Sequence, residues 1–258
     1  MAKFGIKTLL ASVLVAGTMG GAAMAAGKVE APKDVDWHHE GPFGTYDRAQ
    51  LQRGYQVYKE VCASCHSMHF VAFRNLLDIG FTEDQAKAIA GEFTVTDGPD
   101  SNGDMFDRPA ILSDRFPSPF ANKNAAMASN GGAYPPDLSL LAKARVGGED
   151  YIYSLLSGYV AEGGHSEHPC PEGTHANPYF PGGCLKMPLP ISEGQVEYVD
   201  GTEATVDQMS MDVAAFMTWA AEPKMEERKR MGLKVIIFLL VTCGLLYAAK
   251  KRIWSDLH

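Results

Sequence analysis

Two cysteines and a histidine stand together in the run Cys62-Ala63-Ser64-Cys65-His66, and any fold for this chain has to accommodate what they bind. In a helical segment, Cys62 and Cys65 lie three positions apart on one face, so both sulfurs can reach the two vinyl groups of one porphyrin. The adjacent His66 then points at the iron. This spacing is typical of c-type haem attachment, and it predicts one covalently bound haem c per chain.

Two other sites use a close cysteine pair, a zinc site and a thioredoxin-like redox pair. A four-thiolate zinc site needs a second close pair, which the remaining Cys170, Cys184 and Cys243 do not provide. A redox pair has no need of the adjacent His66. Haem attachment is therefore favoured, and apolar residues near helical spacing over 51–58 predict a helix that leads into the motif.

The amino-terminal residues have the organisation of a secretory signal peptide. Lys3 and Lys7 precede the apolar run 9–16, and Ala23-Met24-Ala25 fits a small-x-small cleavage site. This apolar run is far shorter than the roughly 20 residues that span a bilayer. We therefore predict a signal peptide over residues 1–25 and an exported mature protein.

A second apolar segment lies near the carboxyl terminus. Residues 235–249 carry no charge, and extension back to Met231 gives a segment long enough to span, with Lys234 near enough to its end to reach the surface. The basic run 250–252 follows, as expected for a cytoplasmic end. We predict an anchor region over 225–250 and a short cytoplasmic tail over 251–258. A buried core helix is the weaker alternative.

Residues 26–224 are long enough for one exported domain with a full core. Helical segments alternate with long Pro/Gly-rich connections, which predicts a mainly α fold built around a cofactor. The formal net charge of −8 argues against a nucleic-acid partner and favours docking of a basic one. The acidic stretch 97–104 fails the EF-hand pattern and is expected to be a solvated, turn-rich loop. Three further helices are expected, over 82–90, 149–158 and 206–221.

An iron that only passes electrons needs a second axial ligand, and a methionine thioether would raise its potential relative to a second imidazole. Met187 lies in a Pro-stiffened loop over 184–190 where a ligand could be held rigidly. The residues alone leave other candidates open: Met68, Met105, Met127, His165, His168 and His175.

Ordered matches to one family extend over nearly all of the mature chain. They comprise Arg53-Gly54-Tyr55-Gln56-Val57-Tyr58, Cys65-His66-Ser67-Met68, Asp97-Gly98-Pro99, Met105-Phe106-Asp107-Arg108-Pro109, Ser113-Asp114-Arg115-Phe116-Pro117, Pro135-Pro136-Asp137-Leu138-Ser139, Gly147-Gly148-Glu149-Asp150-Tyr151, Asn177-Pro178-Tyr179-Phe180-Pro181-Gly182, Trp219-Ala220-Ala221-Glu222-Pro223 and Arg228-Lys229-Arg230-Met231-Gly232. With these residues the chain resembles the cytochrome c1 family, the haem-bearing subunits of quinol:cytochrome c oxidoreductase (bc1) complexes.

The resemblance implies roles that spacing cannot assign. Met187 matches the distal iron ligand and His66 the proximal one, with Cys62 and Cys65 as the covalent anchors. Arg145 matches an arginine that faces a haem propionate, where a guanidinium can pair with the carboxylate. Four further residues fall where the family lines the haem crevice: Tyr151, Asn130, Pro135 and Pro136.

A cysteine pair distinguishes this chain from mitochondrial members of the family, which lack it, whereas some bacterial members carry a disulfide in the same region. A bridge between Cys170 and Cys184 is therefore expected, and it would pin the loop just before Met187. A metal site made with His165, His168 or His175 is the competing interpretation.

The function that the resemblance implies is electron transfer. The chain would accept electrons from the Rieske iron–sulfur protein and pass them to a soluble or membrane-tethered cytochrome c. It would do so beside the cytochrome b subunit of a dimeric, proton-translocating complex in the bacterial inner membrane. It would be a single-pass protein with its haem domain in the periplasm. It would have no bond-making site of its own. The alternatives are a membrane-anchored mono-haem protein of another respiratory complex and a haem sensor with an open sixth position.

Overall fold

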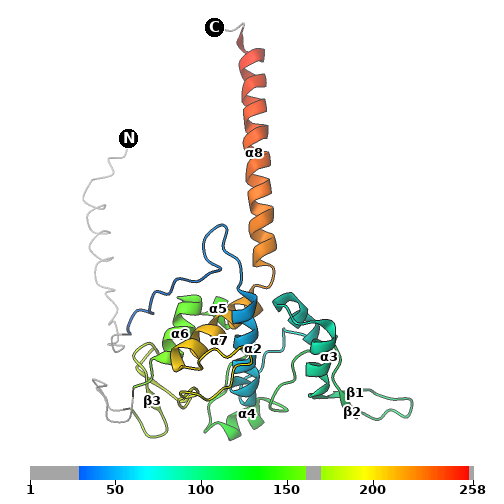
Figure 1. Cartoon of the computed structure of the whole chain (residues 1–258), viewed down its shortest axis with the longest axis vertical. Coiled ribbons are helices and arrows are strands. Elements are labelled where there is room, and N and C mark those ends of the chain that lie inside the picture. Colours follow the sequence, from blue (N-terminus) through cyan, green and yellow to red (C-terminus); the bar gives the residue numbers. More distant parts are fainter. Residues whose placement is uncertain (1–28, 161–169, 256–258) are drawn as a thin grey trace, which may run out of the picture.

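The structure, a computed structural model, describes residues 29–160 and 170–255. The predicted signal peptide over 1–25 and the rival ligands His165 and His168 lie outside these residues. Figure 1 shows a head of short helices, small hairpins and long connections at one end of a single long helix. The expected mainly α fold is therefore confirmed.

The helix that leads into the cysteine motif is α2, Arg48–Glu60, as predicted. It begins at Asp47, whose side chain accepts hydrogen bonds from two amides of the first turn. The motif then forms one 3-10 turn, η1 (Cys62–Ser64), rather than a continuation of the α-helix. Because residues three apart are eclipsed in a 3-10 helix, Cys62 and Cys65 still share one side of the turn.

The three other helices expected in the head are present as α3 (Glu83–Gly91), α6 (Gly148–Ser157) and α7 (Val206–Ala221). Helix α3 begins at a capping box, in which Thr82 and Gln85 each bond the other's backbone amide through the side chain. Short elements complete the helical part of the head: η2 (Phe73–Ile79), α4 (Lys123–Ser129) and α5 (Leu141–Ala144).

Two small antiparallel hairpins interrupt the helices. Strands β1 (Thr94–Asp97) and β2 (Phe106–Pro109) flank the turn-rich acidic loop and project from the side of the head in Figure 1. Strands β3 (His175–Ala176) and β4 (Cys184–Leu185) form the second hairpin. The sequence did not predict β1 and β2, since most of their residues are exposed and no apolar alternation marks them.

Helices α2 and α7 pack closely together and form the centre of the head. A Cβ atom added at Gly54 of α2 would overlap the backbone carbonyl of Asp212 on α7. The Asp212 side chain is fully buried, and its carboxylate accepts hydrogen bonds from Arg53 Nε at 2.9 Å and Nη2 at 3.2 Å. One glycine and one buried ion pair thus set the distance between the two helices.

An aromatic cluster lies beneath the cysteine motif. Tyr55 and Tyr58 of α2 pack against Phe116 and Phe216, with ring centroids 5.8–5.9 Å apart. Phe73 of η2 extends the cluster, 5.0 Å from Phe116. Aromatic pairs at this range contribute about 0.5–1.5 kcal/mol each beyond their buried area. The turn that contains the motif therefore packs against a well-packed aromatic cluster.

The long helix is α8, Met225–Ile253, and it leaves the head as a single rod in Figure 1. Its most apolar stretch has a mean hydropathy of 2.2 and none of that stretch is buried in the protein. Lys250, Lys251 and Arg252 occupy its last turn, where they also complement the helix dipole. The predicted anchor region, 225–250, lies within this helix, and in the described part of the chain α8 is the one helix long and apolar enough to cross a membrane, which fits a membrane-anchored protein.

Candidate functional site

His66 is oriented by a backbone carbonyl. Its Nδ1 lies 2.8 Å from the oxygen of Pro136. Because a carbonyl oxygen can only accept, Nδ1 carries the proton and Nε2 keeps its lone pair. Burial lowers the pKa of His66, although the bond to Pro136 opposes that shift, so the ring is neutral at pH 7. His66 is thus in the tautomer that a metal ligand needs.

The two cysteines of the motif are free thiols on the same turn. The amides of Cys65 and His66 both donate to the carbonyl of Cys62, at 3.1 and 2.9 Å. Burial, reinforced by Cys65, raises the pKa of Cys62 to about 12, so this group is a protonated thiol. Two thiols and a neutral imidazole on one turn fit the attachment of haem c.

The backbone after His66 lies alongside the loop that supplies Pro136. The Leu138 amide donates to the Ser67 carbonyl at 2.8 Å, and Ser67 Oγ donates to the Asp137 carboxylate at 2.8 Å. Burial tends to raise the pKa of Asp137, but hydrogen bonds from Ser139, His69 and Ser67 outweigh it and hold the pKa below its usual value. Sequence reasoning did not single out Asp137; its only signal was the run 135–139.

Met187 lies on a loop with several tethers. Its side chain is half-buried against the core, and its carbonyl accepts a hydrogen bond from the Tyr159 hydroxyl at 3.0 Å. Burial raises the pKa of Tyr159, which keeps that hydroxyl protonated as a donor. The preceding Lys186 donates from Nζ to the Gly131 carbonyl at 3.1 Å. Pro188 stiffens the other side.

A disulfide adds a covalent tether to this loop. Cys170 and Cys184 are bonded, with Cα atoms 5.6 Å apart. Cys184 belongs to β4, which ends two residues before Met187. The amide of Asn177 also bonds the carbonyl of Gly183, at 2.8 Å. The chain that approaches Met187 is therefore fixed by a hairpin and a disulfide.

One loop, residues 130–139, contacts both ligand-bearing segments. Pro136 accepts from His66 near one end of the loop, and Gly131 accepts from Lys186 near the other. Asn130 begins the loop at the end of α4, where its side-chain amide donates to the Ala126 carbonyl at 2.7 Å. Three of the expected crevice residues, Asn130, Pro135 and Pro136, thus belong to the loop that joins the His66 side to the Met187 side.

Arg145 and Tyr151 lie together where α5 leads into α6. Arg145 is exposed and donates from Nη1 to the Ala144 carbonyl at 3.1 Å. Burial raises the pKa of Tyr151, while the neighbouring guanidinium of Arg145 partly opposes that shift. A charged group that is exposed beside a half-buried tyrosine remains available to a carboxylate.

The rival ligands are placed differently. Met68 is fully buried in the core and Met105 is 60% exposed beside the tip of the β1–β2 hairpin. Met127 is half-buried on α4, and His175 belongs to β3 within the disulfide-closed loop. Met187 lies on a loop that the Lys186 bond to Gly131 ties to the segment that also orients His66.

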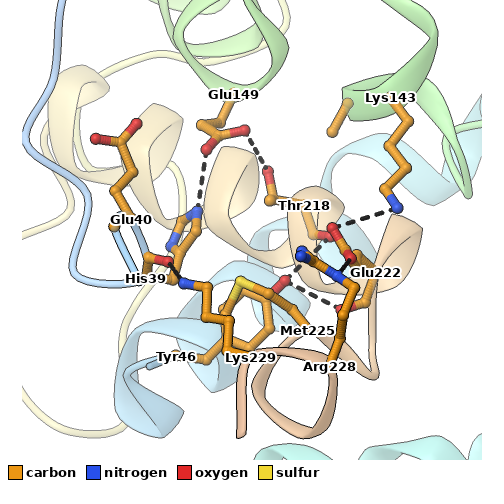
Figure 2. Close-up of a pocket in the computed structure, with 12 residues that line it drawn as sticks. His39, Glu40, Tyr46, Lys143, Glu149, Thr218, Glu222, Met225, Arg228 and Lys229 are labelled. Carbon is orange, nitrogen blue, oxygen red and sulfur yellow. Dashed lines mark hydrogen bonds and ion pairs between the residues drawn. The ribbon is translucent and has the colours of Figure 1, made fainter. Parts of the chain in front are cut away.

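A separate polar pocket of about 270 Å³ lies where the amino-terminal segment meets α7 and α8 (Figure 2). The ring of His39, which is buried, lies 3.1 Å from the Glu149 carboxylate, and Lys143 lies 3.2 Å from Glu222. Lys229 of α8 donates to the carbonyls of His39 and Gly44 at 2.5 and 3.1 Å. The pocket contains none of the predicted cofactor residues; its contacts fix the start of the anchor to the head.

Comparison with known proteins agrees with the geometry. Residues 37–257 match the model of the cytochrome C1 family. A cytochrome c1 of Rhodospirillum rubrum is 49% identical, covering 96% of this chain and 98% of that protein. A cytochrome b/c1 of Bradyrhizobium diazoefficiens is 45% identical over all of this chain and 40% of its own length. A mitochondrial cytochrome b-c1 complex catalytic subunit of Candida albicans is 46% identical, covering 88% of this chain and 78% of that protein.

Proposed function

Because the chain belongs to the cytochrome c1 family, we propose that it takes single electrons from a Rieske iron–sulfur protein and passes them to a soluble or membrane-tethered cytochrome c. Its cofactor is haem c, and its role is electron transfer within the cytochrome bc1 complex. The single observation that supports the site is the bond from His66 Nδ1 to Pro136, which leaves the Nε2 lone pair available on the turn that carries the two free cysteines.

Each residue of the site has a distinct part in this proposal. The thiols of Cys62 and Cys65 would bind the porphyrin covalently, and His66 Nε2 and the Met187 sulfur would hold the iron. The haem, when bound, supplies one-electron chemistry between ferrous and ferric iron. The tethers around Met187 hold the backbone of its loop, which would keep its sulfur in place and limit reorganisation during electron transfer.

Arg145 and the residues that line the crevice would surround the haem. We assign Arg145 to a haem propionate, because its exposed guanidinium can present two parallel donors to a carboxylate. Tyr151, beside it, and Asn130, Pro135 and Pro136 would line the crevice. Burial of the iron among these groups limits access of water and of small ligands.

The proposed arrangement in the membrane rests on α8 together with the predicted signal peptide. A signal peptide over 1–25 would export the head, so that 26–224 lie in the periplasm, 225–250 cross the inner membrane and 251–258 are cytoplasmic. The relative named cytochrome b/c1 supports a cytochrome b subunit as the neighbour of the anchor. The complex would be dimeric, as proton-translocating quinol:cytochrome c reductases of this family are expected to be.

Two measurements on the detergent-purified protein test the proposal. A site closed by His66 and Met187 should not bind carbon monoxide in the ferrous state, whereas a haem sensor with an open sixth position should bind it. The protein should also co-purify with a b-type cytochrome and a Rieske protein, and reduction of its haem should depend on that Rieske protein. Carbon monoxide binding to the native protein, or purification with a different oxidase, would contradict the proposal.

A further inference from the structure

Asp137 lies one residue from the carbonyl that orients His66, and it bonds the segment that follows His66. We propose that Asp137 is a positioning residue for the proximal ligand: its carboxylate holds the Pro136 carbonyl against His66 Nδ1. The inference rests on the proposed role of His66 as an iron ligand. It concerns what keeps that ligand in place.

The carboxylate of Asp137 is the meeting point of four hydrogen bonds. Its Oδ2 accepts from Ser67 Oγ at 2.8 Å, from the His69 amide at 3.1 Å and from His69 Nδ1 at 2.5 Å. Its Oδ1 accepts from the Ser139 amide at 2.9 Å. Three of the donors belong to the two residues 67 and 69, directly after the proximal ligand. The fourth belongs to the loop that contains Pro136.

Two more bonds continue the same pairing. The Leu138 amide donates to the Ser67 carbonyl at 2.8 Å, and the Phe70 amide donates to Ser139 Oγ at 3.1 Å. Residues 66–70 and 136–139 therefore run side by side, with the bond from His66 to Pro136 at the start of the pairing. Asp137 bonds both segments at once, so its loss would weaken their pairing next to that bond.

The chemistry of the contacts requires a carboxylate. All four donors point at its two oxygens, and hydrogen bonds to a charged acceptor are about twice as strong as neutral ones. The lowered pKa of Asp137 keeps it ionised at neutral pH. An asparagine would turn an NH2 group, which only donates, toward either Ser139 or the donors on Ser67 and His69. The two segments would then lose at least one hydrogen bond, and the asparagine NH2 would face another donor in an unfavourable contact.

The effect on the iron has a predictable direction. A firm hydrogen bond from Nδ1 to a carbonyl fixes the ring and raises the basicity of Nε2, which favours the ferric state. A loosened bond should therefore raise the reduction potential. Loss of the negative charge of Asp137 would shift the potential in the same direction, so the experiment has to separate positioning from charge.

Three variants of the holoprotein, purified in its complex, separate them. Asp137→Asn removes both the charge and the pairing. Ser67→Ala keeps the charge and removes one donor to Asp137. Asp104→Asn is the matched control, since it removes one carboxylate from the exposed acidic loop between β1 and β2. The readouts are the midpoint potential, the ferric low-spin EPR spectrum, which reports the axial histidine, and deuterium exchange of peptide 66–70.

The proposal predicts that Asp137→Asn raises the potential, alters the EPR spectrum and accelerates exchange. Ser67→Ala should do the same to a smaller extent, and Asp104→Asn should have none of the three effects. It is overturned if Ser67→Ala matches the wild type while Asp137→Asn shifts the potential with an unchanged EPR spectrum, since charge alone would then act. If Asp137→Asn fails to assemble, Ser67→Ala still decides. A wild-type spectrum without a low-spin histidine signature would instead contradict the proposed ligand set.

Discussion

The two sides of the site are built by different means. The His66 side is the 3-10 turn η1 that directly follows α2, and it packs on the α2–α7 contact and the aromatic cluster below the motif. The Met187 side is a loop without regular structure beyond the two residues of β4, and it is held by a disulfide, by Tyr159 and by Lys186. The first belongs to the core of the domain; the second is attached to it.

This difference predicts that substitutions on the two sides have different effects. A change beneath the His66 side should lower the free energy of unfolding of the whole head, because it disturbs the main helix packing. A change in the tethers of Met187 should also alter the reduction potential and the accessibility of the iron. Each prediction below tests one side against a matched control.

The largest expected effect is on the His66 side. Arg53→Met leaves the buried carboxylate of Asp212 without its guanidinium, and breaking a buried ion pair in this way costs about 3–5 kcal/mol. The control Arg48→Met removes a more exposed pair with Glu226 and should cost only about 0–1 kcal/mol. Denaturant unfolding of the two variants measures the difference. Equal midpoints would show that the α2–α7 ion pair contributes no more to the free energy of unfolding than the exposed pair does.

Next in size is the covalent tether of the Met187 side. Cys170→Ala opens a loop whose closure contributes about 3 kcal/mol on chain-entropy grounds. It should also lower the potential, since Met187 is then held less firmly. Cys243→Ala, in the exposed face of α8, is the control. A redox titration of Cys170→Ala that matches the wild type would mean that the disulfide does not position the distal ligand.

A smaller effect is expected at the glycine of the helix contact. Gly54→Ala would press a methyl group into the Asp212 carbonyl, and overpacking of this kind costs about 1–3 kcal/mol. Gly91→Ala, at the end of α3 with open space around it, should instead stabilise the protein by about 0.5–1 kcal/mol. Melting temperatures that shift in the same direction for both variants would refute the close contact.

The sequence predicted the His66 side better than the Met187 side, for a physical reason. The start of α3 is marked by two residues close in sequence, Thr82 and Gln85, and the spacing of Cys62 and Cys65 directly indicates haem attachment. Tyr159 lies 28 residues from its partner Met187, and Gly131 lies 55 residues from its partner Lys186, so no local pattern connects them. Only the resemblance to a family selected Met187.

The same limit explains what was missed. The β1–β2 hairpin has exposed strands without apolar alternation, so its pairing cannot be predicted from hydrophobic pattern. In the sequence, Asp137 has the pattern of an ordinary loop aspartate; only the fold places residues 67 and 69 beside it. Both features depend on contacts between segments that the sequence keeps apart.

The most direct test of the account is to remove the distal ligand alone. Met187→Leu keeps the size of the side chain and all backbone tethers, while Met105→Leu makes the same change on the exposed hairpin. We predict that Met187→Leu retains covalent haem and wild-type unfolding, lowers the reduction potential and lets the ferrous protein bind carbon monoxide, whereas Met105→Leu behaves as the wild type. A Met187→Leu variant with unchanged potential that still refuses carbon monoxide would contradict the account.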